Sequence, residues 1–293
     1  MKEQFRNQRF NTKSQDLLQK CISILHEYEQ KQIKVTLRQL YYQLVARSFI
    51  PNIDKEYHKL SGLLTDARYN AIIDWDAIED RIRIPYRHPQ FDNVLDLIQC
   101  AKNSYRLDRW QNQNNYVEVF CEKDAISGVL NPITERWHVY LNVNRGYSSA
   151  TAIYDASKRF LEHDDKTCVL LYLGDHDPSG LDMIRDIQDR LIEFGCSIEV
   201  IPIALTMAQI KQYNPPPNPA KITDSRAKGY INEFGNESWE VDALPPDVMN
   251  DLVNSTIKQY VDVEKMNMIK KQEINDMKQL EEFAKKLGNG EED

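Results

Sequence analysis

TCVLLYLGDHDPSG, residues 167–180, is the stretch of the chain that decides its fold class. Its first seven residues are almost continuously apolar, as expected of a strand that is buried on both faces. A glycine and two aspartates follow. Pro178 suits the first position of a helix, and Asp177 before it suits the N-cap. The stretch therefore predicts a buried strand that ends in an acidic loop and passes directly into a helix.

The same alternation of strand and helix extends on both sides of this stretch. Strand patterns cover residues 116–121, 138–144, 167–173 and 197–204, and helical patterns cover 124–136, 149–162 and 178–194. Helical crossovers between short apolar strands predict a parallel, Rossmann-like sheet with helices on both faces. The proline-rich residues 214–219 predict an extended loop, and 245–260 and 264–287 predict closing helices.

The residues before this α/β region predict a helical unit. Helical patterns cover 14–30 and 55–71, and between them Thr36 and Gln39 form a capping box that opens another helix. Residues 71–87 hold two short apolar segments that could form a β-wing. We therefore expect a winged-helix, DNA-binding domain over 1–112. An α/β domain over 113–262 and a charged helix with its tail over 263–293 complete the predicted organisation.

Composition narrows the class of protein. The 293 residues are 41% hydrophobic and 28% charged, which is the balance of a globular chain. No apolar run has the roughly 18 residues of a membrane span, and the polar N-terminus does not resemble a secretory signal. Five scattered cysteines without a CxxC pair exclude a disulfide framework and a thiolate zinc site. We expect a cytoplasmic protein that does not bind membranes.

Charge is distributed unevenly along the chain. Residues 1–115 hold 18 basic and 14 acidic residues, whereas the remainder holds 19 basic and 31 acidic residues. A basic N-terminal part and an acidic C-terminal part are typical of a DNA-binding domain joined to a carboxylate-rich catalytic domain. Chance variation in surface charge explains the same numbers equally well.

Three carboxylates are predicted to meet at one edge of the sheet. Ligands of open parallel sheets bind at the carboxyl ends of the strands, where Glu122 ends the first strand and Asp175 and Asp177 follow the third. In extended backbone Asp175 and Asp177 share one side, while His176 faces the other. Like charges about 4 Å apart repel by about 4 kcal/mol at an effective dielectric constant near 20. A hard cation, Mg²⁺ or Mn²⁺, would remove that cost. The alternative is that Asp177 only caps a helix and Glu122 is incidental.

This order of acidic residues resembles the Toprim domain, the metal-binding α/β module of topoisomerases, bacterial primases and several nucleases. The likeness is greatest to the A subunit of topoisomerase VI and its meiotic relative. There too a strand ends in Glu-Lys, as in Glu122-Lys123, and a glycine turn follows the second strand, as in Arg145-Gly146-Tyr147. The third strand delivers Asp-x-Asp-Pro-x-Gly, as residues 175–180 do. The resemblance implies a Toprim fold and a magnesium site.

The resemblance extends to the predicted winged-helix domain. The family carries an Arg-x-x-Tyr-Tyr element there, matched by residues 38–42, and its second tyrosine forms a covalent link to DNA. Tyr42 would then be the nucleophile, acting on the metal site of a second subunit, which implies a homodimer. By periodicity Tyr41 belongs to the core, whereas Tyr42 lies off the apolar face, one turn after Arg38. There the guanidinium could bind a phosphate or favour the phenolate.

One departure from that family and one further relative keep alternatives open. The chain has no Walker-type glycine loop, so strand passage would need a separate ATPase subunit. The Toprim nuclease subunit of the Wadjet plasmid-defence systems is another relative, and it cleaves DNA without a covalent tyrosine. Metal-activated water is therefore the alternative nucleophile to Tyr42.

Several basic residues are candidates for contacting DNA. They are Arg38, Lys55, Lys59 and Arg68 in the helical unit, and Lys123, Arg145, Lys221 and Arg226 near the predicted metal edge. Lys55, Lys59 and Arg68 also suit an ordinary solvated helix face. Lys123 could bind phosphate or neutralise the acidic cluster.

The function expected from these observations is Mg²⁺-dependent DNA cleavage. Glu122, Asp175 and Asp177 would hold the metal, and Tyr42 or water would attack the phosphodiester. One alternative is a non-catalytic DNA-binding or assembly subunit that docks through residues 264–287. Another is a phosphatase with Asp175 as nucleophile, which leaves Glu122 and the N-terminal helices unexplained.

Overall fold

A four-stranded parallel sheet forms the centre of the molecule. The computed structural model describes residues 2–79, 88–220, 224 and 226–288. The strands lie in the order β4-β3-β5-β6, with bounds β3 Asn115–Cys121, β4 Tyr140–Val143, β5 Thr167–Leu173 and β6 Glu199–Ala204. Every neighbouring pair is parallel. The predicted α/β fold with a parallel sheet is confirmed.

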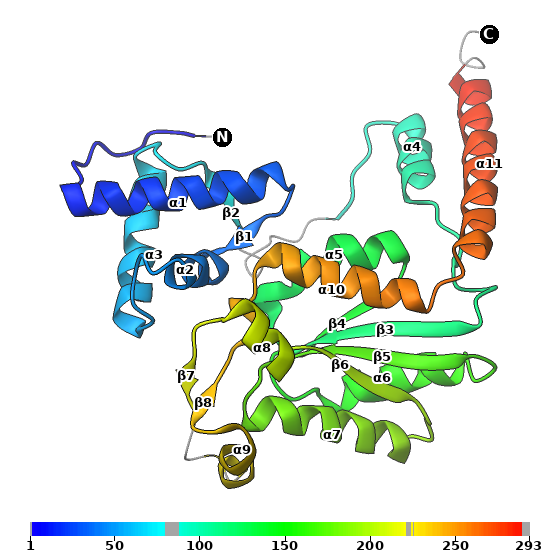
Figure 1. The fold of residues 1–293 in the computed structure, drawn as a ribbon. Helices are drawn as coiled ribbons and strands as arrows, with labels where there is room; N and C mark the ends of the chain where they lie inside the picture. Colours follow the sequence, from blue (N-terminus) through cyan, green and yellow to red (C-terminus); the bar gives the residue numbers. More distant parts are fainter. Residues whose placement is uncertain (1, 80–87, 221–223, 225, 289–293) are drawn as a thin grey trace.

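Helices cover both faces of this sheet, as Figure 1 shows. Helices α5 (Asp124–Trp137) and α10 (Pro246–Gln259) lie on one face, and α6 (Ala150–Leu161) and α7 (Pro178–Glu193) on the other. Alternate side chains of each strand enter two separate cores. Val117 and Val119 of β3 belong to the core under α5 and α10, whereas Phe120 belongs to the core under α6 and α7.

One charged side chain lies inside the second of these cores. Glu118, in the middle of β3, is fully buried, and its carboxylate accepts two hydrogen bonds from Arg159 of α6 at 2.6 and 2.8 Å. The Tyr116 hydroxyl and the Asn142 side-chain amide each donate a further bond to it at 2.9 Å. All of these partners are needed, because a buried carboxylate without compensation is strongly destabilising.

Arg159→Met is therefore expected to lower the free energy of unfolding by about 3–5 kcal/mol, because it leaves the Glu118 charge buried without its cation. Arg185→Met is the matched control, since Arg185 forms its ion pairs on α7 with a side chain that is 62% exposed. The control should change stability by less than about 0.5 kcal/mol. Urea denaturation of both variants measures the difference. Equal stability of the two variants would contradict this role of Arg159.

Three helices form the N-terminal unit, as predicted. They are α1 (Thr12–Gln30), α2 (Leu37–Ala46) and α3 (Asp54–Tyr69). The capping box at the start of α2 is present, since the Thr36 side chain accepts from the Gln39 backbone and the Gln39 side chain accepts from the Thr36 backbone N–H. These helices enclose a core of their own, centred on Leu40, Leu44 and Leu60.

The predicted β-wing is not seen in the described part of residues 71–87. A short helix, η1 (Trp75–Ala77), leads into strand β2 (Ile78–Glu79), which pairs in parallel with β1 (Val35–Thr36). A wing would instead pair two strands of the segment with each other. Residues 80–87 lie outside the described part of the chain.

The remaining elements are short, apart from two helices that lie side by side. These elements are α8 (Met207–Tyr213), β7 (Asn218–Pro219), α9 (Ala227–Phe234), β8 (Glu237–Ser238) and η2 (Val241–Ala243). Helix α4 (Val94–Ser104) packs against α11 (Val263–Gly288) and stands away from the sheet in Figure 1. Among the described residues, no helix combines the length and the apolar character needed to cross a membrane.

Candidate active site between the sheet and the N-terminal helices

The carboxyl ends of β3 and β5 meet, which brings two of the predicted carboxylates together. The Glu122 N–H donates to the Leu173 carbonyl at 2.9 Å, continuing the pairing of the two strands by one residue. The Glu122 side chain is buried, and its Oε2 accepts a hydrogen bond from the Asp175 N–H at 2.9 Å. The predicted adjacency of these two strand ends is confirmed.

Two glycines allow this close approach. A Cβ on Gly174 would lie 2.9 Å from Glu122 Oε2 and 2.5 Å from the Tyr172 ring. A Cβ on Gly180 would lie 2.1 Å from the Asp175 carbonyl oxygen, which belongs to the backbone and cannot move aside. A larger residue at position 174 would collide with the Tyr172 and Glu122 side chains, and one at position 180 would collide with the Asp175 backbone, so both glycines are needed for this packing.

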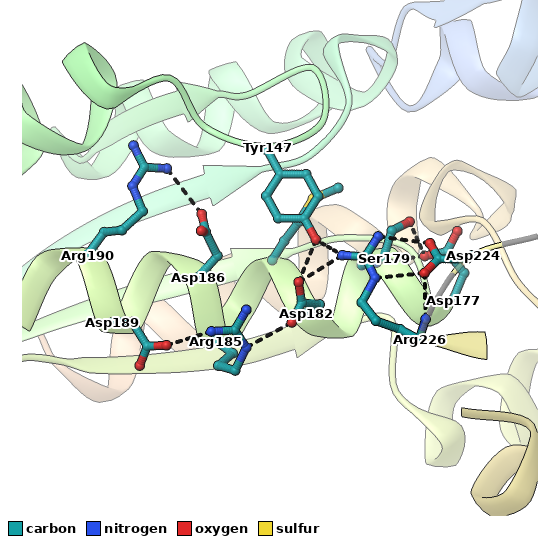
Figure 2. Close-up of polar contacts among 12 residues, drawn as sticks. Tyr147, Asp177, Ser179, Asp182, Arg185, Asp186, Asp189, Arg190, Asp224 and Arg226 are labelled. Atoms are coloured by element: carbon teal, nitrogen blue, oxygen red, sulfur yellow. Dashed lines mark hydrogen bonds and ion pairs between the residues drawn. The ribbon is translucent and has the colours of Figure 1, made fainter. Parts of the chain in front are cut away.

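Asp177 forms the N-cap of α7, as predicted. Its Oδ1 accepts hydrogen bonds from the Gly180 N–H at 2.6 Å and from the Ser179 hydroxyl at 2.8 Å. Figure 2 shows Asp177 and Ser179 together at the start of the helix. The capping interpretation and the metal-ligand interpretation are compatible, because a carboxylate has a second oxygen.

His176 points away from the carboxylates, as predicted, and is only 3% exposed. Its Nδ1 lies 2.8 Å from the Tyr230 hydroxyl, and its backbone forms an antiparallel bridge with Trp239, with hydrogen bonds of 2.8 and 3.1 Å. This bridge therefore holds residues 239–242, which are distant in sequence, beside the acidic loop.

Residues 239–242 contribute two acidic side chains that the sequence pattern did not single out. Lys123 Nζ lies 2.8 Å from Asp175 Oδ1, 2.9 Å from Glu240 Oε2 and 3.1 Å from Asp242 Oδ1. Arg38 pairs with the same two residues, contacting Glu240 and lying 2.7 Å from Asp242 Oδ2 through its Nε. A usable signal was present, because Glu240-x-Asp242 repeats the spacing of Asp175-x-Asp177.

Electrostatics divides these carboxylates into two groups. Burial opposes the charge on Glu240, but Lys123 and Arg38 outweigh it and lower its pKa to about 2. Burial also opposes the charge on Lys123, yet the surrounding carboxylates raise its pKa above the usual value. For Asp175 burial wins over Lys123 and raises the pKa to about 7, and burial likewise raises the pKa of Glu122. The charge on Glu240 is thus compensated within the protein, whereas the charges on Asp175 and Glu122 are compensated only in part.

This difference predicts a pH-dependent effect of Asp175→Asn on stability. Below the ordinary pKa of 3.8 the Asp175 carboxyl is protonated in both the folded and the unfolded chain, so it makes no difference. As the pH rises to about 7 the unfolded chain ionises first, which destabilises the fold, and above that pH the penalty is complete. Asp175→Asn removes the penalty and should stabilise the metal-free protein by about 2–4 kcal/mol at pH 8.

Urea denaturation of wild type and Asp175→Asn at pH 5 and pH 8 checks this expectation in the presence of a chelator. Asp189→Asn serves as the control, because Asp189 lies on the exposed side of α7 with a side chain that is 59% exposed. A stability difference between wild type and Asp175→Asn that does not grow with pH would contradict the account.

Tyr42 is buried, contrary to prediction. Only 4% of its surface is exposed, because α2 is covered on a second side by η2. Arg38 lies 5.8 Å from its ring centroid, and its charge favours the phenolate. Burial and then the carboxylates of Asp242 and Glu240 outweigh Arg38 and raise the pKa of Tyr42. Burial and these carboxylates therefore favour the neutral phenol, and the Glu240 carboxylate lies near its hydroxyl.

Tyr42 and the acidic loop nevertheless border the same space. A cavity of about 290 Å³ lies between the N-terminal helices and the edge of the sheet. It is lined by Arg38, Tyr41, Tyr42, Asn52, Asp54, Tyr57, Asp175, Asp177, Asn218, Pro219, Ser238, Trp239 and Glu240. The tyrosine predicted to serve a second subunit therefore lines the same cavity as Asp175 and Asp177 of its own chain.

Most of the predicted DNA-binding residues lie elsewhere. Lys55 and Lys59 are exposed on α3, but Arg68 donates to the Ile78 carbonyl at 2.8 Å, so the three do not form one basic face. Arg145 is 65% exposed and lies 3.5 Å from Asp124. Lys221 lies outside the described residues.

Arg226 is held within the protein rather than presented to a ligand. It forms a two-pronged ion pair with Asp224, with both nitrogen–oxygen distances at 2.8 Å, and a third contact with Asp182 at 2.8 Å. The Tyr147 hydroxyl donates to Asp182 at 2.6 Å and also contacts Arg226, as Figure 2 shows. This network ties the turn after β4 to α7 and to the start of α9.

The residues at the sheet edge suit a magnesium ion in their chemistry. Within 2–79, 88–220, 224 and 226–288, no three His, Cys, Asp or Glu residues already stand in an arrangement that would hold a metal. Asp175 Oδ1 instead contacts Lys123 and accepts from the Val241 N–H at 2.9 Å. The donors are carboxylate oxygens, which Mg²⁺ prefers, and burial disfavours their charge without a cation. They fit a hard cation if Lys123 withdraws toward Glu240 and Asp242, which it already contacts.

Comparison with known proteins finds no matching family and no matching curated protein. The fold and the geometry of this site are therefore the basis for assigning a function.

Proposed function

We propose that this chain is a metal-dependent DNA-cleaving protein of the Toprim class, similar to the A subunit of topoisomerase VI, with a winged-helix type of N-terminal domain. The observation that carries the proposal is that Tyr42, Asp175 and Asp177 line one shared cavity. Beside it, Glu122 accepts a hydrogen bond from the Asp175 backbone. A phenol and a carboxylate cluster at the carboxyl edge of a parallel sheet support phosphodiester chemistry.

Each residue has a role in this mechanism. Glu122, Asp175 and Asp177 would hold Mg²⁺ or Mn²⁺, which supplies positive charge against the scissile phosphate. Tyr42 Oη attacks phosphorus, so that an oxygen–phosphorus bond forms to the tyrosine and the bond to one sugar oxygen breaks. The proton of the phenol passes to solvent, because Glu240, whose pKa Lys123 and Arg38 lower to about 2, is too weak a base to take it. The departing sugar oxygen takes up a proton from solvent.

The proposal does not need a second copy of the chain. The expectation of a homodimer depended on Tyr42 acting at the metal site of a partner, whereas Tyr42 and Asp175 of one chain line one cavity. Water remains the alternative nucleophile, because burial raises the pKa of Tyr42 and so disfavours the reactive phenolate. Strand passage, in contrast to cleavage, would need a separate ATPase subunit.

A second candidate is a non-catalytic DNA-binding or assembly subunit. The ion pairs favour a non-catalytic role. Arg38 and Lys123, the basic residues beside the carboxylates, are both paired with Glu240 and Asp242 and so are not free to stabilise a scissile phosphate. Such a subunit would bind DNA in a salt-sensitive manner without cutting it.

Nicking of a supercoiled plasmid separates the two candidates. We expect the protein to convert supercoiled to open-circular plasmid with Mg²⁺ or Mn²⁺ and not with a chelator. Salt-sensitive plasmid binding without any cleavage, under every divalent metal tried, would reject the enzyme and support the binding subunit.

A further inference from the structure

The ammonium group of Lys123 lies against the acidic loop. Lys123 stands between the end of β3 and the start of α5, and its Nζ lies 2.8 Å from Asp175 Oδ1. Its side chain is only 18% exposed, so the charge is held inside the protein. In the part of the chain that the structure describes, no other basic side chain lies within 4 Å of the Asp175 carboxylate. Lys123 therefore supplies the positive charge beside Asp175.

The same ammonium group has a second set of partners. Its Nζ lies 2.9 Å from Glu240 Oε2 and 3.1 Å from Asp242 Oδ1. Lys123 can therefore lose its contact with Asp175 and still remain paired with two carboxylates. A small movement is enough, because the ammonium group sits at the end of a flexible four-carbon chain.

Arg38 shares this second set of partners and comes from the N-terminal helices. It contacts Glu240, and its Nε lies 2.7 Å from Asp242 Oδ2. The Asp242 side chain is fully buried, with Lys123 at one oxygen and Arg38 at the other. These ion pairs join α2 to the α/β domain. Two cations thus divide three carboxylates between them, so a change at one cation alters the hold on the other.

A divalent cation bound by Asp175 would change this division. It would repel the ammonium group of Lys123, since charges in a partly buried site are screened little by water and salt. Lys123 would then move fully onto Glu240 and Asp242, where its charge weakens their attraction for Arg38. Linkage of this kind is reciprocal, so Arg38 must in turn oppose the cation by keeping Lys123 at Asp175.

From these shared partners, we infer that Lys123 competes with the divalent cation for Asp175 and couples cation binding to the Arg38 contacts between the two parts of the molecule. The inference rests on the proposed function for the presence of a cation at Asp175, and it adds a regulation of that site. Cation binding loosens the N-terminal helices from the α/β domain, and release of Arg38 raises the affinity for the cation.

A double-mutant cycle on Mn²⁺ affinity, followed by electron paramagnetic resonance, tests the coupling without requiring activity. Lys123→Gln should bind Mn²⁺ about tenfold more tightly than wild type, because the competing charge is gone. Arg38→Gln should bind about fivefold more tightly, because Lys123 then turns to Glu240 and Asp242. In the double variant the added effect of Arg38→Gln should fall below about twofold, because Arg38 acts through Lys123.

A second cycle keeps the test decisive if Arg38→Gln does not fold, which circular dichroism detects. Glu240→Gln removes one alternative partner of Lys123 and should weaken Mn²⁺ binding by about threefold, but by less than about twofold in the Lys123→Gln background. Arg145→Gln is the control for loss of one positive charge, because Arg145 is 65% exposed and contacts Asp124. Its Mn²⁺ affinity should stay within about twofold of wild type.

The outcomes separate this inference from the proposed function. Wild-type affinity in Lys123→Gln, or effects of Arg38→Gln and Glu240→Gln that are the same with and without Lys123, would overturn the coupling and leave the enzyme intact. Non-additive Mn²⁺ affinities without any plasmid cleavage would reject the enzyme and support the coupling. Absence of Mn²⁺ binding in wild type and in Lys123→Gln alike would reject both.

Discussion

Asp175→Asn is expected to abolish DNA cleavage, lowering the rate by about 10³-fold, while the protein remains folded. An amide keeps the shape of the carboxylate and can still accept the hydrogen bond from the Val241 N–H, which Asp175 Oδ1 now accepts at 2.9 Å. It loses the negative charge that holds a divalent cation, and such charge stabilisation contributes several kcal/mol to phosphoryl chemistry. The rate of plasmid nicking at saturating Mg²⁺ measures the effect.

A stability measurement on the same variant separates loss of catalysis from misfolding. The same substitution should make the metal-free protein more stable at pH 8, because it removes a buried charge whose pKa is raised to about 7. Loss of activity together with a gain in stability cannot result from misfolding. Asp189→Asn, on the exposed side of α7, should keep full activity. Nicking by Asp175→Asn within threefold of wild type would exclude Asp175 from the reaction.

The second large effect concerns Tyr42→Phe, which should lose the covalent protein–DNA product entirely. Phenylalanine keeps the ring in the core beside Tyr41, whose centroid is 5.4 Å away, and removes only the hydroxyl that would attack phosphorus. Denaturing gels with labelled DNA detect the adduct. Tyr41→Phe, on the same helix as Tyr42, is the matched control, because the Tyr41 hydroxyl donates to Asn52 Oδ1 at 3.1 Å and should not be required. An adduct formed by Tyr42→Phe would exclude this nucleophile.

Mixing the two inactive variants then shows whether one chain suffices. Because Tyr42 and Asp175 line the same cavity in one chain, an equal mixture of Tyr42→Phe and Asp175→Asn should remain inactive. If the tyrosine instead served a partner's carboxylates, half of the dimers would be mixed and each would have one complete site. About a quarter of the wild-type activity would then return, which would contradict the single-chain site.

Local sequence pattern was sufficient to predict the sheet and its acidic edge. The strands of residues 116–121 and 167–173 are short apolar runs, and the structure places them at 115–121 and 167–173. Their ends had to meet once the strands were neighbours, so Glu122 and Asp175 were predictable as partners. The cap at Asp177 was predictable as well, because an aspartate before a proline is a strong helix-start signal.

Contacts between distant segments could not be predicted in this way. Glu240 and Asp242 reach Lys123 only because the backbone of His176 pairs with that of Trp239, far along the chain. Tyr42 was placed off the apolar face by helical periodicity, which describes one buried face, whereas α2 is covered by η2 on a second side. Basic residues such as Arg226 were candidates for phosphate only while their acidic partners, Asp224 and Asp182, were unknown.

Manganese binding followed by electron paramagnetic resonance tests most directly whether these carboxylates form a cation site. The account predicts that wild-type protein binds at least one Mn²⁺, that excess Mg²⁺ displaces it, and that the triple variant Glu122→Gln, Asp175→Asn, Asp177→Asn binds none. Equal Mn²⁺ binding by wild type and the triple variant, or no binding by wild type at millimolar Mn²⁺, would contradict it.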